Sequence, residues 1–202
     1  MKILVTGGAG FIGTNLIKRL LKEKHEVWSM DNYISGKEEN HIEGCTYLFY
    51  DITELEPRHF RAGFITDEVR KVLDSVDVIF HLAALARIQP SLVYPKPALE
   101  VNFNGTLNVL EWARHNDVQV IYAGSSSKHH GLYGSPYAWS KYGGEELCKL
   151  YSEVYGLNTS ICRFYNVYGD HMPMTGGYRT VLPIFLEQHK NGEPLTITSD
   201  GE

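Results

Sequence analysis

A tyrosine and a lysine four residues apart, Tyr137 and Lys141, are the residues of this chain whose types and spacing best suit chemistry. They stand at the start of a segment, 137–155, whose Ala, Glu, Leu and Lys content predicts a helix opened by Ser135 and Pro136. Residues i and i+4 share a helix face, so the ammonium can lie close to the phenol and favour its ionised form. Such a pair could move the proton of a sugar or alcohol hydroxyl at neutral pH. Because the spacing also fits an ordinary amphipathic helix, the interpretation depends on the rest of the chain.

The N-terminal residues predict a phosphate-binding turn. A short apolar run, 2–6, leads directly into Gly7-Gly8-Ala9-Gly10-Phe11-Ile12-Gly13, and a helical pattern follows at 15–24. Strand, glycine turn and helix is the context that a dinucleotide fingerprint requires. Glycines let backbone amides approach a pyrophosphate, and the helix N-terminus favours its negative charge. The candidate cofactor contacts in this turn are Gly7, Gly10, Phe11 and Ile12.

An aspartate follows the next predicted strand, 26–30. Asp31 lies 18 residues beyond Gly13, the spacing expected for a carboxylate that binds a ribose diol. A carboxylate accepts hydrogen bonds from the 2′-hydroxyl and repels a 2′-phosphate, so the sequence predicts NAD rather than NADP. A surface aspartate that merely ends a strand is the lesser alternative.

Two later strands end in further candidates for a cofactor site. The predicted strand 46–50 is followed by Asp51, which could meet the adenine amine or cap a helix, and by Ile52, which could cover the adenine ring. A ragged helical pattern, 57–75, precedes the nearly continuous apolar run 76–82, which is typical of a strand buried on both faces of a parallel sheet. That run leads into Leu82, Ala83 and Ala84, where a cofactor could lie against the backbone, whereas His81 is expected to pack or cap.

The second half of the chain offers residues for a substrate. Arg87 lies in a polar loop that could cover the cleft, and the long predicted helix 96–114 carries Asn102, expected to tie it to the next strand. The predicted strand 118–123 runs into the serines 125–127, at the sheet edge where ligands bind in open α/β folds. The paired histidines 129 and 130 lack a third ligand at suitable spacing, so no metal site is expected.

The order of these patterns predicts an α/β fold, a doubly wound parallel (Rossmann) sheet with helices on both faces. We expect an NAD-binding domain with the Tyr/Lys pair at 1–165, followed by a further segment at 166–202. A strand at 158–164, a helix at 180–190 and a short strand at 195–198 complete the prediction.

Composition excludes several other classes of protein. The 202 residues are 43% hydrophobic and 21% charged, which is typical of an ordinary globular chain. The net charge of -5 gives no support for nucleic-acid binding, and no apolar stretch approaches a membrane span. Three cysteines without a Cys-x-x-Cys pair suit a reducing compartment, so a cytoplasmic protein is expected.

Together these motifs resemble the extended short-chain dehydrogenase/reductase family, the NAD-dependent nucleotide-sugar epimerases and dehydratases. The resemblance spans nearly the whole chain. It rests on the glycine motif, Asp31-Asn32, Asp51-Ile52, His-Leu-Ala-Ala from 81, Asn-Gly-Thr from 104, the serine run, Tyr-x-x-x-Lys and Arg163-Phe-Tyr-Asn-Val-Tyr-Gly.

The resemblance implies roles for individual residues. Tyr137 would be the catalytic base, Lys141 would bind the nicotinamide ribose, and a serine of 125–127 would hydrogen-bond the reacting hydroxyl. Asn166 would contact the substrate diphosphate, and Asn32 and Tyr165 would join the cofactor site. The family likeness also implies a homodimer formed by the helices 96–114 and 137–155, and a UDP-sugar as substrate.

Two departures from the family pattern affect the catalytic assignment. Only nine residues separate Ser127 from Tyr137, fewer than usual, so strand register favours Ser125 as the catalytic hydroxyl whereas the trailing Gly131 favours Ser126. Dehydratases of this family carry acidic residues just after that hydroxyl. Here Ser127, Lys128 and His129 occupy those positions, which favours an epimerase over a 4,6-dehydratase.

A third departure is that family members usually continue well beyond this length. The resemblance therefore implies that 166–202 are the start of a nucleotide-sugar lobe, an incomplete small substrate-binding lobe. The first hypothesis is an epimerase that works through a transient keto-sugar with tightly held NAD. The alternatives are a truncated NAD-binding module with little turnover, a dehydratase or reductase of the same family, and an alcohol dehydrogenase that releases NADH. A serine hydrolase is disfavoured because the serine run lacks Gly-x-Ser-x-Gly.

Overall fold

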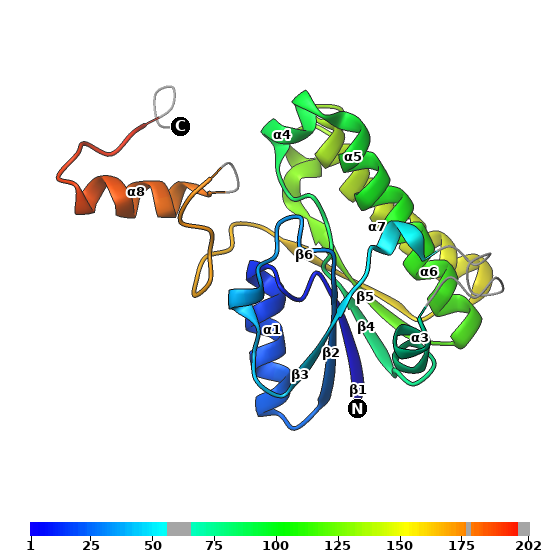
Figure 1. Ribbon diagram of the computed structural model, residues 1–202. Helices are drawn as coiled ribbons and strands as arrows, with labels where there is room; N and C mark the ends of the chain where they lie inside the picture. Colours follow the sequence, from blue (N-terminus) through cyan, green and yellow to red (C-terminus); the bar gives the residue numbers. More distant parts are fainter. Residues whose placement is uncertain (56–65, 177–178, 198–202) are drawn as a thin grey trace.

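The computed structural model describes residues 1–55, 66–176 and 179–197, apart from the side chain of His130. Its centre is a six-stranded, entirely parallel sheet with the order β3-β2-β1-β4-β5-β6 (Figure 1). The strands are β1 (Lys2–Thr6), β2 (Glu26–Asp31), β3 (Cys45–Phe49), β4 (Val78–His81), β5 (Gln119–Ser125) and β6 (Thr159–Phe164). The doubly wound prediction is confirmed, and the order reverses between β1 and β4, where such sheets bind ligands.

Helices connect the strands. They are α1 (Phe11–Lys22), α3 (Asp67–Leu73), α4 (Ile88–Val93), α5 (Pro95–Leu99), α6 (Gly105–Asn116), α7 (Pro136–Tyr155) and α8 (Val181–Lys190). A π-helical segment, η3 (Glu100–Asn104), joins α5 to α6, so the predicted helix 96–114 exists as one run with a widened turn. Short 3-10 segments are η1 (Glu38–Asn40), η2 (Ile52–Glu54) and η4 (Ser126–His130).

The core lies on both faces of the sheet, as the alternation of side chains along a strand requires. On β1, Ile3 and Val5 pack with Ile17 and Leu20 of α1, whereas Leu4 faces the opposite side. That second, larger cluster contains buried residues of α3, α6 and α7 (Figure 1). Because both faces are covered, the sheet can hold its carboxyl edge rigid for a ligand site.

The N-terminus of α7 has a well-defined local cause. Pro136 occupies its first turn, where the missing backbone N–H is not needed. The Ser135 hydroxyl accepts a hydrogen bond from the Ala138 N–H at 3.1 Å and thereby caps the helix. At the other end Gly156 adopts φ +70, a conformation that favours glycine. These signals fix the helix start next to Tyr137.

Three sequence-based boundaries change in the structure. Helix α1 begins at Phe11, inside the glycine motif, rather than at residue 15. Of the predicted helix 57–75, α3 occupies 67–73, while 56–65 lie outside the described residues. The predicted strand 195–198 is wrong over its described part, 195–197, because no neighbouring strand runs alongside to form a ladder there. The Thr196 N–H instead donates to the Gln188 side chain at 3.1 Å.

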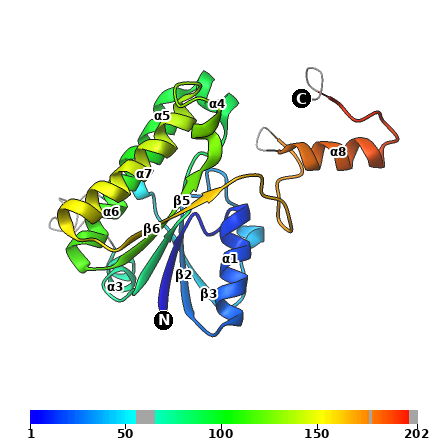
Figure 2. The same cartoon turned by 180° about the vertical axis from the view of Figure 1, so that it is seen from behind.

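Helix α8 and residues 191–197 stand apart from the sheet in both views (Figures 1 and 2). Its apolar side chains Val181, Leu182 and Leu186 are 56%, 39% and 49% exposed. Helix α8 therefore adds nothing to the core of the sheet.

Candidate active site

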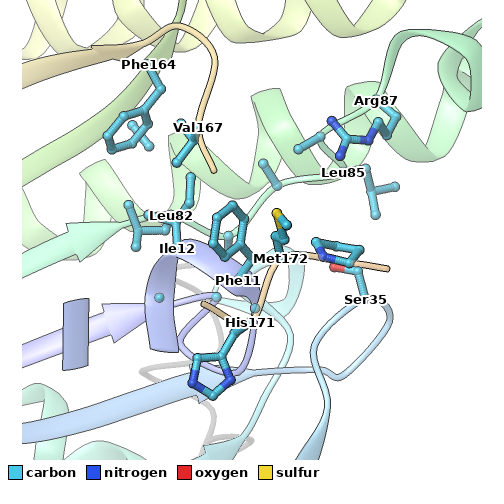
Figure 3. A pocket seen from close by; sticks show the side chains of 18 of the residues that line it. Phe11, Ile12, Ser35, Leu82, Leu85, Arg87, Phe164, Val167, His171 and Met172 are labelled. Carbon is cyan, nitrogen blue, oxygen red and sulfur yellow. The ribbon is translucent and has the colours of Figure 1, made fainter. Parts of the chain in front are cut away.

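One cavity of about 980 Å³ opens at the carboxyl edge of the sheet (Figure 3). It extends from the glycine turn past the ends of β4 and β5 to the segment before α8. Most of the residues predicted from the sequence line it. They are Gly7, Gly10, Phe11, Ile12, Asp31, Asn32, Ile52, Leu82, Ala83, Ala84, Arg87, Ser125, Tyr137, Lys141, Tyr165 and Asn166. Asp51 and Ser126 are not among its lining residues.

The glycine turn packs directly against the loop after β4. Gly7 adopts φ +72, and a Cβ added to it would lie 2.7 Å from the Ala83 backbone nitrogen. A Cβ on Gly13 would lie 2.3 Å from the Gly7 carbonyl oxygen, so α1 approaches the turn as closely as backbones allow. The glycines of the turn therefore present backbone to the cavity, and their amides lie at a helix N-terminus that suits a phosphate.

Asp31 ends β2 with its carboxylate held from two sides. One oxygen accepts the Ala9 N–H at 3.0 Å, and the other accepts the Tyr33 N–H at 2.8 Å. Each oxygen retains a further lone pair for a ligand. Burial raises the pKa of Asp31, against the opposing effect of the two backbone hydrogen bonds. The side chain is oriented before any ligand arrives, as a diol-binding carboxylate requires.

Asp51 lies outside the cavity lining and belongs to a small hydrogen-bond network. Its Oδ2 accepts from the Asn32 side chain at 2.6 Å, and its Oδ1 accepts from the Thr53 N–H at 2.8 Å as the cap of η2. Burial by itself would raise the pKa of Asp51, but these hydrogen bonds outweigh it and the pKa lies below its ordinary value. The capping alternative for Asp51 is thus seen directly, and Ile52 beside it lines the cavity.

Ser125 and Tyr137 lie next to each other on the cavity wall. The Tyr137 hydroxyl donates to the Ser125 Oγ at 3.5 Å, and Ser125 ends β5. The Ser125 Oγ also accepts the Ser127 N–H at 3.2 Å, which turns the chain into η4. Ser126 does not line the cavity. The geometry favours Ser125 over Ser126 as the hydroxyl that works with Tyr137.

Lys141 lies one helical turn beyond Tyr137 and is 5% exposed. Burial lowers the pKa of its ammonium to about 8. Its Nζ lies 4.3 Å from the centroid of the Tyr122 ring, a cation-π distance that stabilises the charged form. The lysine therefore keeps a positive charge at neutral pH beside the cavity wall that carries Tyr137 and Ser125.

Three polar residues that the sequence did not single out as site residues hold this helix in place. The Ser91 hydroxyl accepts the Tyr137 N–H at 3.2 Å, so α4 contributes to the start of α7. Asn102 bonds the Leu85 N–H and C=O at 2.7 and 3.2 Å and donates to the Ser140 hydroxyl at 3.1 Å. The expected tie to the next strand is wrong: Asn102 joins the loop after β4 to α7.

His81 is structural, as expected. Its Nδ1 lies 2.7 Å from the Thr6 hydroxyl and its Nε2 lies 3.0 Å from the Thr106 hydroxyl. The Thr106 hydroxyl donates to the Asn102 carbonyl at 2.7 Å, so it accepts from Nε2–H, and Nδ1 accepts from Thr6. Burial lowers the pKa of His81 from 6.5 to about 3. The ring is a neutral bridge between β1, β4 and α6.

This neutral histidine predicts a loss of stability in acid. Below pH 6.5 the unfolded chain binds a proton at His81, whereas the folded chain does not bind it until about pH 3. The free energy of unfolding therefore decreases as the pH falls through that window. Between pH 7.5 and 5 the wild type should lose up to about 2 kcal/mol more unfolding free energy than a His81→Gln variant. Urea unfolding at the two pH values measures this difference. Equal losses in both proteins would contradict it.

The segment 165–175, which follows β6, contributes to the lining of the cavity. The Asn15 side chain on α1 donates to the Asp170 carbonyl at 2.7 Å, and the His171 ring lies 3.3 Å from the Asn40 side-chain oxygen. Figure 3 shows His171 and Met172 on the side of Phe11 and Ser35, with Leu85 and Arg87 at another end of the view. The segment thus bridges α1 and the loop after β2.

The described part of the chain contains no cluster of three His, Cys, Asp or Glu residues that could hold a metal ion. None of its described helices has the length and apolar character that a membrane crossing needs.

Solved structures of other proteins share this fold over nearly the whole chain. The chain is 30% identical to UDP-glucose 4-epimerase from Thermotoga maritima, crystallised with UDP-glucose, with a TM-score of 0.86 over 100% of this chain and 67% of that one. A UDP-glucose 4-epimerase from Thermus thermophilus, in complex with NAD, is 32% identical with a TM-score of 0.79, over 98% of this chain and 65% of that one.

Curated proteins are also similar to this chain in sequence. A putative UDP-glucose 4-epimerase from Methanocaldococcus jannaschii is 32% identical over 213 residues, 98% of this chain and 66% of its own length. A UDP-N-acetyl-alpha-D-glucosaminuronate decarboxylase from Bacillus cytotoxicus is also 32% identical, over 100% of this chain and 65% of its own. The chain thus spans about two thirds of the length of these relatives. The model of the NAD dependent epimerase/dehydratase family matches residues 3–202, and the chain belongs to that family.

Proposed function

We propose that this chain carries the cofactor and catalytic half of an NAD-dependent nucleotide-sugar epimerase, of the type that inverts C4 of a UDP-sugar through a keto-sugar. The observation that carries this proposal is the placement of Tyr137, Ser125 and Lys141 in the same cavity as the glycine turn and Asp31. A dinucleotide site and a proton-transfer pair in one cavity are what reversible oxidation of a hydroxyl requires.

The residues present fit NAD. The glycine turn offers backbone amides to the pyrophosphate, Asp31 offers lone pairs to the adenosine ribose, and Ile52 offers an apolar surface to the adenine. Leu82, Ala83 and Ala84 provide small and apolar walls along the ends of the strands. Bound there, NAD would supply the hydride acceptor. Because Asp31 is a carboxylate, we expect NAD to bind more tightly than NADP.

The protein's own part in the reaction is proton transfer and positioning. Tyr137 would take the proton of the sugar hydroxyl as hydride leaves the carbon that bears it, and would return the proton after hydride comes back to the other face. Ser125, 3.5 Å from the Tyr137 hydroxyl, would hydrogen-bond the same sugar oxygen. The Lys141 ammonium would bind the ribose next to the nicotinamide. Its positive charge would also favour the ionised form of the Tyr137 phenol.

The sugar nucleotide would occupy the end of the cavity lined by Arg87, Tyr165 and Asn166. We propose that Asn166 contacts its diphosphate and that 166–202 begin the lobe that encloses it. A UDP-sugar is proposed because the named epimerase and decarboxylase relatives act on UDP compounds. Epimerisation is preferred to dehydration because Ser127, Lys128 and His129 supply no carboxylate beside the reacting hydroxyl.

A second candidate function is an NAD-binding module with little turnover of its own. The exposed apolar side chains of α8 favour it, because such a surface is normally covered by more protein. Remote contacts to the nucleotide help to hold a substrate for reaction, so these 202 residues by themselves could bind NAD and leave sugars unchanged.

One experiment separates these candidates. The purified chain is incubated with UDP-, GDP- and dTDP-sugars, without cofactor or with added NAD or NADP, while NMR follows the sugars and absorbance follows reduced nicotinamide. An epimerase inverts a sugar without net NADH, a dehydratase or decarboxylase changes its composition, and an alcohol dehydrogenase accumulates NADH. NAD binding with no converted sugar would reject the epimerase for this chain and leave the module.

We propose in addition that the protein is a homodimer formed through α7 and the helical run 95–116. On α7, Leu150 and Val154 are one turn apart and 50% and 61% exposed, and Trp139 lies three turns before Leu150 at 40% exposed. An apolar stripe of this kind suits a second copy. Light scattering should give twice the chain mass, and a monomeric mass would reject the dimer.

We also propose a cytoplasmic location, and the free cysteines of the chain support it. All three cysteines, Cys45, Cys148 and Cys162, are free thiols in the structure. Burial raises the pKa of Cys45 and Cys148 to about 12, so these two thiols stay protonated and unreactive. Fractionation of the native cells would test the location, and recovery outside the cytoplasm would reject it.

A further inference from the structure

A buried carboxylate lies behind the catalytic pair and takes no part in the proposed reaction. Glu145 is on α7, one turn beyond Lys141, and its side chain is 0% exposed. Its Oε2 accepts from the Lys128 ammonium at 3.0 Å, and both of its oxygens accept from the Arg163 Nε, at 3.0 and 2.9 Å. We call Glu145, Lys128 and Arg163 the carboxylate clamp.

The clamp joins three elements that meet at the catalytic serine. Lys128 lies in η4, directly after Ser125 to Ser127, and Arg163 lies on β6, the strand that pairs with the end of β5. Gly124, next to Ser125, packs so close that an added Cβ would lie 2.6 Å from Glu145 Oε1. The carboxylate is therefore in contact with the chain on both sides of Ser125.

The buried charge of Glu145 is balanced by the two cations of the clamp. Burial by itself would raise the pKa of Glu145, but the hydrogen bonds from Arg163 and Lys128 outweigh it and the pKa lies below its ordinary value. A buried carboxylate needs its partners, and a neutral side chain at 128 would leave it with one cation instead of two. The Lys128 side chain is 18% exposed and also lies 5.4 Å from the centroid of the Tyr142 ring, again on α7.

We propose that Lys128 is a positioning residue, which through Glu145 holds the Ser125 to Ser127 segment against α7 at hydrogen-bond distance from Tyr137. Lys128 stands where the acidic residues of the related dehydratases are expected, but its ammonium points to α7, and it does not line the cavity. The inference rests on the proposed function, because Ser125 and Tyr137 are the groups that it positions.

The test compares Lys128→Met with Lys128→Arg and with Lys149→Met. Lys149 pairs with Glu146 at 2.6 Å on the exposed face of the same helix, so it controls for the loss of a lysine ion pair on α7. Because a misplacement of about 1 Å can cost about a hundredfold in rate, Lys128→Met should lower kcat about tenfold to a hundredfold with little change in KM. Lys128→Arg should restore most of the rate, and Lys149→Met should leave it unchanged.

A double variant distinguishes positioning from a general structural role. If Lys128 acts through Ser125, Lys128→Met should have no further effect on kcat in a Ser125→Ala background. Multiplied losses in the double variant would overturn the proposal, as would an unchanged kcat in Lys128→Met.

Hydrogen exchange tests the clamp without any turnover. In the NAD-saturated full chain, amides 125–130 of Lys128→Met should exchange at least about tenfold faster than those of the wild type, with Lys149→Met as the unchanged control. If the wild type converts no sugar nucleotide, the proposed function fails and this exchange alone decides the clamp. Unchanged exchange in Lys128→Met would overturn the proposal whether or not the wild type is active.

Discussion

Replacing Tyr137 by Phe is expected to lower kcat for sugar inversion by about 10²–10⁴-fold, the range that a positioned acid–base group contributes. The variant removes one oxygen and leaves the ring. The Tyr137 hydroxyl donates to Ser125 and is not part of the core, so folding and NAD affinity should remain close to those of the wild type. Steady-state rates by NMR and NAD titration by calorimetry measure both quantities.

A matched control exists four residues earlier. Tyr133 is 88% exposed and does not line the cavity, so Tyr133→Phe should keep the wild-type rate. A Tyr137→Phe protein that inverts its substrate within a few-fold of the wild-type rate would show that another group carries the proton, and the roles assigned to Ser125 and Lys141 would lose their basis.

The second large effect is expected at the glycine turn, where Gly13→Ala should destabilise the fold and impair NAD binding together. An added Cβ would lie 2.3 Å from the Gly7 carbonyl oxygen and 2.6 Å from the Gly8 Cα, and both are backbone atoms that cannot rotate away. Helix α1 must then move off the turn, at a cost of about 1–3 kcal/mol for overpacking. The helix N-terminus and the amides that would face the pyrophosphate move with it.

The neighbouring Gly10 provides the comparison. A Cβ at Gly10 meets only the Gly7 carbonyl oxygen, at 3.3 Å, and Gly10 has φ -83, which any residue adopts. Gly10→Ala should therefore unfold close to the wild-type temperature while lowering NAD affinity, since its new methyl group enters the cavity lining. Thermal unfolding and calorimetry distinguish the two variants. Equal stability of Gly13→Ala and the wild type would contradict the packing argument.

Much of the fold could be predicted from short stretches of sequence because local physics determines them. The glycine motif between an apolar run and a helix has one common use, and the structure shows the turn with α1 starting inside it. Ser135 and Pro136 marked the start of α7 because capping depends on neighbouring residues. The spacing of Tyr137 and Lys141 then placed both on the cavity wall.

Contacts between distant segments could not be read in this way. Ser125 and Ser126 were equivalent candidates in the sequence, and only the pairing of β5 with β6 and the turn into η4 bring Ser125 toward Tyr137. Ser91 gave no signal for its bond to the Tyr137 N–H across 46 residues. Glu145 had one weak signal, its four-residue spacing from Lys141, but its partners Lys128 and Arg163 come from other elements.

In the proposed reaction, hydride leaves a sugar carbon and returns to it within a single site. The measurement is NMR of a UDP-hexose labelled with deuterium at C4, incubated with the purified chain in ordinary water. We expect inversion at C4 with the deuterium retained in the product and no net NADH. Inversion with the deuterium washed out would contradict the hydride route, and no inversion in a chain that binds NAD would contradict the epimerase.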